Sequence, residues 1–217
     1  MFFLYKISQN KLRKIMKLIY LHGLDSDSNA IKAQITQTYC QANYPNIEVI
    51  RPDLNRTPDE VVKLLKSLII DDRNTVLIGS SLGGYFANLL SDLTGVPAVL
   101  LNPSIWPDIS FRRFLDQNFD ERALSDETVI YTTTGGWQIT YGDLAWFERH
   151  RLAVKNPDLI KVLLKMGDEL LDAQVTQAFY DQKGVQVLAQ AGGDHRISDY
   201  EVQVATVIDW AIRLHQR

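Results

Sequence analysis

The chain has 217 residues, a formal net charge of −3 and one cysteine, Cys40. This length favours one domain around one sizeable core, and the weak negative charge argues against a nucleic-acid partner, which needs clustered lysine and arginine. One cysteine excludes an intramolecular disulfide and a thiolate metal cluster, which fits a reducing, cytoplasmic setting. No apolar run approaches the ~20 residues that a membrane span needs.

Residues 1–15 stand apart from the pattern that follows them. Their apolar residues come before their basic residues, whereas a secretory signal begins with positive charge, and no small-residue cleavage site follows. Met16 is a natural start for the first strand pattern. We therefore expect residues 1–15 to be an N-terminal extension without assigned function, and residues 16–217 to form a single domain.

The rest of the chain alternates predicted strands and helices. In chain order these are a strand at 17–21, a helix at 30–42, a strand at 47–50, a helix at 58–70, a strand at 75–78, a helix at 83–93 and a strand at 97–101. The alternation resumes with a strand at 159–166, a helix at 175–182, a strand at 185–189 and a helix at 199–214. This α/β pattern is typical of a mostly parallel sheet of about six strands with helices on both faces.

The most informative motif is Gly79-Ser80-Ser81-Leu82-Gly83, between the strand at 75–78 and the helix at 83–93. It fits G-x-S-x-G in the strand–turn–helix context of a nucleophile elbow. Glycines at both ends allow strand and helix to approach closely, and the turn lifts the Ser81 hydroxyl above the sheet edge. Backbone N–H groups at the helix start can stabilise an oxyanion. The alternative is a glycine-rich turn without chemistry.

A serine nucleophile needs a histidine base, which an acid must orient. Among the four histidines we predict His195, because it lies on a loop between the strand at 185–189 and the last helix. His150 lies in a charged cluster and His215 in a polar tail, and we expect both at the surface. His22 precedes the serine in the chain, whereas in serine hydrolases with a nucleophile elbow the histidine base follows the serine.

The orienting acid is predicted to be Asp168, the first carboxylate after the strand that precedes the histidine strand. There it can accept a hydrogen bond from His195 and stabilise the imidazolium. Asp172 is the competitor, but it fits better as the N-cap of the next helix. Asp194 is expected to form a turn, and Glu169 to be a rim or substrate-facing residue.

A fourth element follows the first strand, where His22-Gly23 opens a loop. In serine hydrolases of this architecture, such a loop gives the second oxyanion N–H. We predict that the backbone N–H groups of Leu24 and Leu82 form the oxyanion hole, and that His22 orders the loop by hydrogen bonding. The four elements occur in the expected order, each at a predicted strand end, which is far more specific than any one of them.

Residues 104–156 fall outside the strand–helix rhythm and are rich in aromatic side chains. We expect a short, mainly helical cap inserted before the strand that carries the acid. Trp106, Trp137 and Trp146 either line an acyl pocket in this cap or pack the cap onto the body, and both interpretations stay open.

Five runs occur together in this chain: residues 19–26, 79–85, 101–103, 167–172 and 192–195. As a set, spread between residues 16 and 213, they resemble the YqiA/YcfP-type esterases, small bacterial proteins of the UPF0227 kind. The resemblance implies a minimal α/β-hydrolase fold and esterase activity, with acyl thioesters such as acyl-CoA a reasonable extrapolation. It also implies Ser81, Asp168 and His195 as the triad, with Leu24 and Leu82 as oxyanion donors.

The sequence thus predicts a serine hydrolase that cleaves a small-molecule ester or thioester through an acyl-enzyme, without a metal or organic cofactor. The oligomeric state is left open. Two other classes remain: a non-catalytic protein of the same fold that binds a ligand or partner, and an acyltransferase or C–C hydrolase on the same fold.

Overall fold

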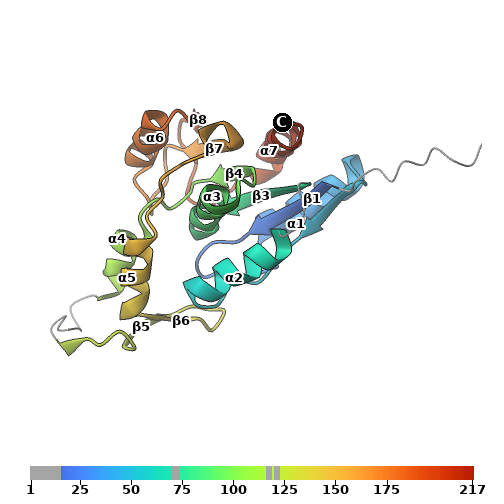
Figure 1. Cartoon of the computed structure of the whole chain (residues 1–217). Helices are drawn as coiled ribbons and strands as arrows, with labels where there is room; N and C mark the ends of the chain where they lie inside the picture. The colour runs from blue at the N-terminus through green and yellow to red at the C-terminus, as the bar shows by residue number, and fades with distance from the viewer. Residues whose placement is uncertain (1–15, 70–73, 116–118, 120–122) are drawn as a thin grey trace, which may run out of the picture.

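The computed structural model describes residues 16–69, 74–115, 119 and 123–217, so the expected extension at residues 1–15 lies outside the described residues. A parallel sheet at the centre has the strand order β2-β1-β3-β4-β7-β8 (Figure 1). Its strands are β1 (Met16–Leu21), β2 (Ile47–Ile50), β3 (Thr75–Ser80), β4 (Ala98–Leu101), β7 (Ile160–Lys165) and β8 (Gln186–Gln190). The predicted sheet of about six strands is confirmed.

Helices cover both faces of this sheet. They are α1 (Ile31–Asn43), α2 (Pro58–Ile69), α3 (Leu82–Thr94), α6 (Ala173–Gln182) and α7 (Tyr200–His215). Leu18 and Tyr20 of β1 belong to the core shared with α1 and α7, whereas Ile19 and Leu21 belong to the core shared with α2 and α3. Because successive strand side chains point to opposite faces, a strand buried on both sides is a continuous apolar run.

Local sequence explains why the helices begin where they do. Pro58 opens α2, and the Glu60 carboxylate accepts hydrogen bonds from the Thr57 backbone N–H (3.1 Å) and hydroxyl (2.8 Å) just before it. Val61 and Leu65, one turn apart on α2, are fully buried against the sheet. The helix predicted at this place therefore forms, with its apolar residues on the face toward the sheet.

The segment between β4 and β7 contains short helices, as expected of the inserted cap, and also a hairpin. It contains α4 (Pro107–Ser110), the 3-10 helix η1 (Phe111–Leu115), the strands β5 (Val129–Thr132) and β6 (Gln138–Thr140), and α5 (Tyr141–Arg149); the short η3 (Pro157–Leu159) then leads into β7. β5 and β6 pair as an antiparallel hairpin, which the sequence did not predict. These strands have four and three residues, too few to show a period. The hairpin lies beside α5 at one end of the molecule (Figure 1).

Hydrogen bonds tie this hairpin to the loops that follow β1 and β2. The Asp25 carboxylate accepts bonds from the Tyr131 hydroxyl (2.7 Å) and the Thr134 backbone N–H (3.0 Å). The bond to Asp25 raises the pKa of Tyr131. The Thr133 hydroxyl donates to Asn55 Oδ1 at 3.2 Å. The hairpin therefore holds the loop that starts at His22 in a fixed position.

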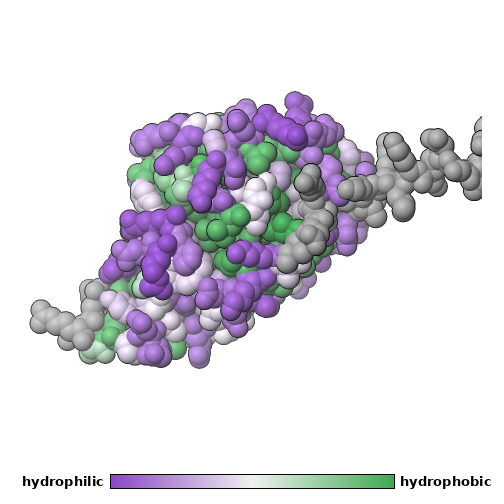
Figure 2. Space-filling view, in the orientation of Figure 1, coloured by the Kyte–Doolittle hydropathy of each residue, from purple (hydrophilic) through white to green (hydrophobic). Residues whose placement is uncertain are grey.

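The outer surface is mixed in character. Hydrophilic residues cover most of the face drawn in Figure 2, and apolar residues lie between them near the middle of the view. Within the residues that the structure describes, no helix combines the length and the apolar character needed to cross a lipid bilayer.

Candidate active site

Ser81 lies at the tight turn where β3 passes into α3. Its backbone has φ +55° and ψ −119°, in a region that residues with side chains rarely occupy. The Ser81 N–H donates to the Leu101 carbonyl at 3.0 Å, and its own carbonyl accepts bonds from the Gly84 N–H (2.9 Å) and the Ser104 N–H (3.0 Å). The surrounding structure thus imposes this strained conformation, as is common at functional sites.

The glycines on either side of Ser81 are required by close backbone contacts. A Cβ atom at Gly79 would lie 2.2 Å from the Gly83 carbonyl oxygen, and one at Gly83 would lie 2.2 Å from the Leu21 carbonyl oxygen. Neither neighbour is a flexible side chain that could move aside. The G-x-S-x-G pattern is therefore set by the geometry of the turn.

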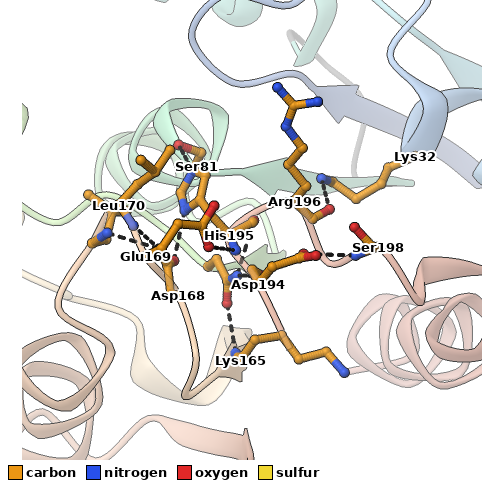
Figure 3. Close-up of polar contacts among 12 residues, drawn as sticks. Lys32, Ser81, Lys165, Asp168, Glu169, Leu170, Asp194, His195, Arg196 and Ser198 are labelled. Atoms are coloured by element: carbon orange, nitrogen blue, oxygen red, sulfur yellow. Dashed lines mark hydrogen bonds and ion pairs between the residues drawn. The ribbon is translucent and has the colours of Figure 1, made fainter. Parts of the chain in front are cut away.

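Three side chains from distant parts of the chain meet above the sheet edge (Figure 3). His195 Nε2 lies 2.9 Å from Ser81 Oγ, and His195 Nδ1 lies 2.7 Å from Asp168 Oδ2. The His195 side chain is 12% exposed and that of Asp168 is 3% exposed. With the imidazole donating from Nδ1 to the carboxylate, Nε2 accepts from the serine hydroxyl. The structure thus brings the three predicted residues into one hydrogen-bonded line.

Asp168 is held by the loop that carries it. Its Oδ1 accepts backbone N–H bonds from Leu170 and Leu171, both at 2.9 Å, which leaves Oδ2 for His195. Asp172 instead accepts bonds from two backbone N–H groups at the start of α6, both at 3.0 Å, so its predicted role as an N-cap is confirmed.

Two side chains bond to the backbone of His195, one at its N–H and one at its carbonyl. The Glu169 carboxylate, expected at the rim, accepts the His195 N–H at 2.9 Å. Asn102 Nδ2 donates to the carbonyls of Asp194 (3.0 Å) and His195 (3.1 Å). The Oδ1 of Asn102 accepts the Lys165 backbone N–H at 2.8 Å. Asn102 is 1% exposed and has φ +41°. Asn102 therefore joins the ends of β4 and β7 to the histidine loop.

Sequence reasoning assigned no role to Asn102. Its one signal was position, a polar amide directly after the buried strand β4 and within one of the runs that carry the resemblance. An amide suits this place because it both donates and accepts, and the surrounding buried backbone groups need both.

Charged groups also hold the loop after His195. Lys32 Nζ donates to the Arg196 carbonyl at 2.5 Å, which ties the loop to α1 (Figure 3). Burial lowers the pKa of Lys32 to about 8, although the nearby Asp194 opposes this effect. Hydrogen bonds from Ser198 lower the pKa of the Asp194 carboxyl, and the Ile197 N–H donates to the Asp194 carbonyl at 3.1 Å. Asp194 therefore forms the turn that the sequence predicted.

His22 follows β1, which lies on the other side of β3 from the strands that precede Asp168 and His195. Its Nε2 accepts the Leu54 N–H at 2.8 Å, so its proton lies on Nδ1, which donates to the Gly23 carbonyl at 2.8 Å. Both ring nitrogens are thus engaged in holding the loop, which is the ordering role expected for this histidine.

Leu24 and Leu82, the predicted oxyanion donors, lie in the two segments next to the serine. Leu82 is the first residue of α3, and Leu24 follows Gly23, where a Cβ would lie 3.1 Å from Ser81 Cβ. Among the described residues, neither the Leu24 nor the Leu82 N–H has a hydrogen-bond acceptor. The prediction that these two groups form an oxyanion hole therefore meets no competing acceptor in the described part of the chain.

The three tryptophans have different surroundings. Trp137, 5% exposed, lines a small cavity beside the loop after β1. Trp146, 9% exposed, donates from Nε1 to Asp59 at 2.8 Å, which joins α5 to α2. Trp106 is half-buried and meets Phe179 of α6 edge to face, with ring centroids 6.1 Å apart. Trp146 therefore packs α5 onto α2, whereas Trp137 lies next to the candidate site.

The other histidines lie outside the hydrogen-bonded line. His150, expected at the surface, is half-buried and stacks on Trp146 with ring centroids 3.9 Å apart, and its Nδ1 lies 2.8 Å from the Trp146 carbonyl. His215 is the last residue of α7. No group of three or more His, Cys, Asp or Glu side chains in the described part of the chain is arranged to hold a metal ion.

A model of the uncharacterised protein family UPF0227 matches residues 17–212. The chain belongs to this family. One UPF0227 relative, the protein YcfP of Salmonella arizonae, is 27% identical over 164 residues, which cover 72% of this chain and 78% of YcfP. The predicted resemblance to YcfP-type proteins is therefore confirmed.

Solved structures with the same fold include three with low sequence identity to this UPF0227 chain. Est1E from Butyrivibrio proteoclasticus, solved with ferulic acid, has a TM-score of 0.70 at 15% identity and covers 98% of this chain and 94% of its own. An esterase domain from Rhodothermus marinus has a TM-score of 0.66 at 18% identity, and the match covers 94% of this chain and 89% of that domain. The alpha/beta hydrolase domain-containing protein 10 from mouse has a TM-score of 0.62 at 19% identity, and the match covers 91% of this chain and 90% of the mouse chain. The chain therefore has the predicted α/β-hydrolase fold.

Proposed function

We propose that this protein is a serine hydrolase that cleaves carboxylic esters or thioesters of small molecules through an acyl-enzyme. The observation that carries the proposal is the line from Ser81 Oγ through His195 to Asp168, with contacts of 2.9 and 2.7 Å. The N–H groups of Leu24 and Leu82, which have no acceptor among the residues that the structure describes, support it, since acyl transfer requires donors for a developing oxyanion. The shared fold with an esterase domain from Rhodothermus marinus agrees with this reaction class.

In the proposed reaction, His195 Nε2 removes the hydroxyl proton as Ser81 Oγ attacks the carbonyl carbon. The N–H groups of Leu24 and Leu82 bind the carbonyl oxygen as it becomes negative, and Asp168 stabilises the imidazolium through Nδ1. The imidazolium then gives its proton to the leaving alcohol or thiol. Water, activated by the same His195 nitrogen, releases the acid and restores the serine.

The direct test is covalent labelling of the protein with a fluorophosphonate probe. We expect the wild type to be labelled at Ser81, because the probe needs both the activated hydroxyl and the oxyanion donors. The Ser81→Ala variant should remain unlabelled. Mass spectrometry of the labelled peptide gives the site, and a panel of p-nitrophenyl esters and acyl-CoA thioesters gives the reaction.

The outcomes separate the proposed hydrolase from the other two classes. A folded wild type that resists the probe and hydrolyses no ester or thioester would favour a non-catalytic binding protein. Labelling together with transfer of the acyl group to an added alcohol, measured by product analysis, would favour an acyltransferase.

A second prediction concerns Asn102 as a positioning residue. Asn102→Ala removes the donor to the Asp194 and His195 carbonyls and the acceptor of the Lys165 N–H. We expect kcat for ester hydrolysis to fall by about 10- to 100-fold, because a small displacement of His195 weakens proton transfer. KM should change little. Unmet buried polar groups should also lower the free energy of unfolding by about 1–3 kcal/mol.

The matched control is Asn88→Ala. Asn88 is also a fully buried asparagine, and its Oδ1 accepts the Tyr180 hydroxyl at 3.1 Å, but it lies within α3. This variant should lose stability and keep kcat when assayed well below its melting temperature. Equal losses of kcat in both variants would show that Asn102 has only a general structural role.

A further inference from the structure

Lys165, the last residue of β7, has a buried side chain with two bonding partners outside its own strand. Its Nζ atom donates to Gln190 Oε1 at 2.5 Å and to Asp199 Oδ2 at 2.6 Å. The side chain of Lys165 is 6% exposed, whereas that of Asp199 is 42% exposed. The hydrogen bond from Lys165 lowers the pKa of Asp199, so this partner is ionised at neutral pH. The buried ammonium therefore has one charged acceptor and one amide acceptor.

The two partners of Lys165 stand at the two ends of the loop that carries His195. Gln190 is the last residue of β8, and Asp199 is the residue directly before α7. A second chain of bonds joins the same ends, since Gln203 Nε2 donates to Asp199 Oδ2 at 2.7 Å and Gln203 Oε1 accepts from Gln190 Nε2 at 3.0 Å. The four side chains form a closed ring of hydrogen bonds, which holds both ends of this histidine loop to β7.

The aliphatic stem of Lys165 supports the middle of the same loop. A Cβ atom at Gly193 would lie 2.7 Å from Lys165 Cδ, so the loop backbone lies directly against the stem. Gly193 has φ +75°, a conformation that favours glycine. Asp168 follows Lys165 after two residues. Lys165 therefore connects the strand that leads to the acid with the loop that carries the base, while its own side chain points away from Ser81 (Figure 3).

We propose that Lys165 is a positioning residue, which keeps His195 in line with Asp168 by holding the histidine loop to β7. The inference rests on the proposed hydrolase function. The contact of 2.7 Å between His195 Nδ1 and Asp168 Oδ2 joins two different loops, so it persists only while both loops keep their places. Because the ammonium points away from the nucleophile, its loss should disturb proton transfer rather than substrate binding.

The test is the substitution Lys165→Met, which keeps an unbranched apolar stem against Gly193 and removes the ammonium. The backbone N–H at this position stays, so its bond to Asn102 is kept. We expect kcat for p-nitrophenyl acetate to fall by about 10- to 100-fold with little change in KM, because a small displacement of the base slows proton transfer by this order.

Proton NMR measures the positioning directly. The bond between His195 Nδ1 and Asp168 is short and charge-assisted, and a proton in such a bond gives a low-field signal. We expect this signal in the wild type and its loss or weakening in Lys165→Met. The signal is assigned by its absence from Asp168→Asn, in which the acceptor is replaced.

Lys161→Met is the matched control. Lys161 also belongs to β7, and its Nζ donates to Gln186 Oε1 of β8, so the same pair of side chains joins the same two strands. The strand register pairs Lys161 with Gln186 just as it pairs Lys165 with Gln190. The control pair lies at the other end of both strands from the histidine loop. This variant should therefore keep the kcat and the low-field signal of the wild type.

A second variant, Asp199→Ala, decides the question where Lys165→Met does not fold. It removes one of the two acceptors of the ammonium, and the replaced side chain is partly exposed, so little packing is lost. The bond from Lys165 to Gln190 remains in this variant. We therefore expect a smaller fall in kcat, of about tenfold, again with little change in KM and with a weaker low-field signal.

The outcomes separate this inference from the proposed function. A folded Lys165→Met protein that keeps either the kcat or the low-field signal of the wild type would overturn the inference. Equal losses in Lys161→Met would also overturn it, because the effect would then be general to the pairing of β7 and β8. The NMR signal needs no turnover, so it tests the positioning by itself. Failure of every ester and thioester, together with no fluorophosphonate labelling of Ser81, would overturn the proposed function instead.

Discussion

Replacing Ser81 with alanine is expected to lower kcat/KM for ester hydrolysis by about 10⁴- to 10⁶-fold. The variant keeps the His195–Asp168 pair and the two backbone donors, so a small rate above the uncatalysed reaction should remain. An acyl-enzyme cannot form without the hydroxyl, and hydrolysis would then require direct attack by water. Steady-state assays with p-nitrophenyl acetate, corrected for the reaction without enzyme, measure this loss.

The matched control for this change is the neighbouring serine. Ser80 is buried at the end of β3, and Ser80→Ala removes one hydroxyl from the same turn without touching the line to His195. We expect its kcat/KM to stay within about threefold of the wild type, as expected of a group absent from the transition state. Near wild-type turnover in Ser81→Ala would refute the assignment of the nucleophile.

The central strands β1, β3, β4 and β7 were predictable because nearly all of their residues are buried, which makes them apolar runs. The strand predicted at 185–189 is β8 at Gln186–Gln190, and the helix predicted at 175–182 is α6 at Ala173–Gln182. The earlier start of α6 follows from its cap, since Asp172 is the residue directly before it. Apolar runs and capping side chains are local signals, so the sequence alone carries them.

The hairpin β5–β6 was not predictable in the same way. Its two short strands are held by contacts with distant residues, among them the bond from Tyr131 to Asp25, 106 positions away. The presence of aromatic residues gave no basis for deciding which tryptophan packs and which lies by the site. That distinction depends on tertiary contacts such as the bond between Trp146 and Asp59.

For the candidate site, motifs at strand ends predicted the side chains that meet, because parallel strands end at one edge of a sheet. The predicted order of serine, acid and histidine placed Ser81, Asp168 and His195 together. The residues that hold this line were harder to infer. Asn102 bonds to the His195 carbonyl 93 positions away, and nothing in its local sequence indicates that partner.

The second large effect is expected for Asp168→Asn. The asparagine can keep the backbone bonds from Leu170 and Leu171 through its oxygen, but its NH₂ group then faces His195 Nδ1. Nδ1 becomes the acceptor and the imidazole proton moves to Nε2, where it can no longer take the proton of Ser81. We expect kcat to fall by about 10⁴-fold with little change in KM. The rate of fluorophosphonate labelling at Ser81, measured beside kcat, should fall with it.

Asp172→Asn provides the matched control, since it makes the same carboxylate-to-amide change four residues further along the chain. Asparagine caps helices about as well as aspartate, so this variant should keep its stability within about 0.5 kcal/mol. Its kcat should equal that of the wild type, because Asp172 bonds only to the start of α6 among the described residues. If Asp172→Asn lost activity while Asp168→Asn retained it, the acid would be misassigned. The contact of 2.7 Å between Asp168 and His195 would then serve the fold rather than the reaction.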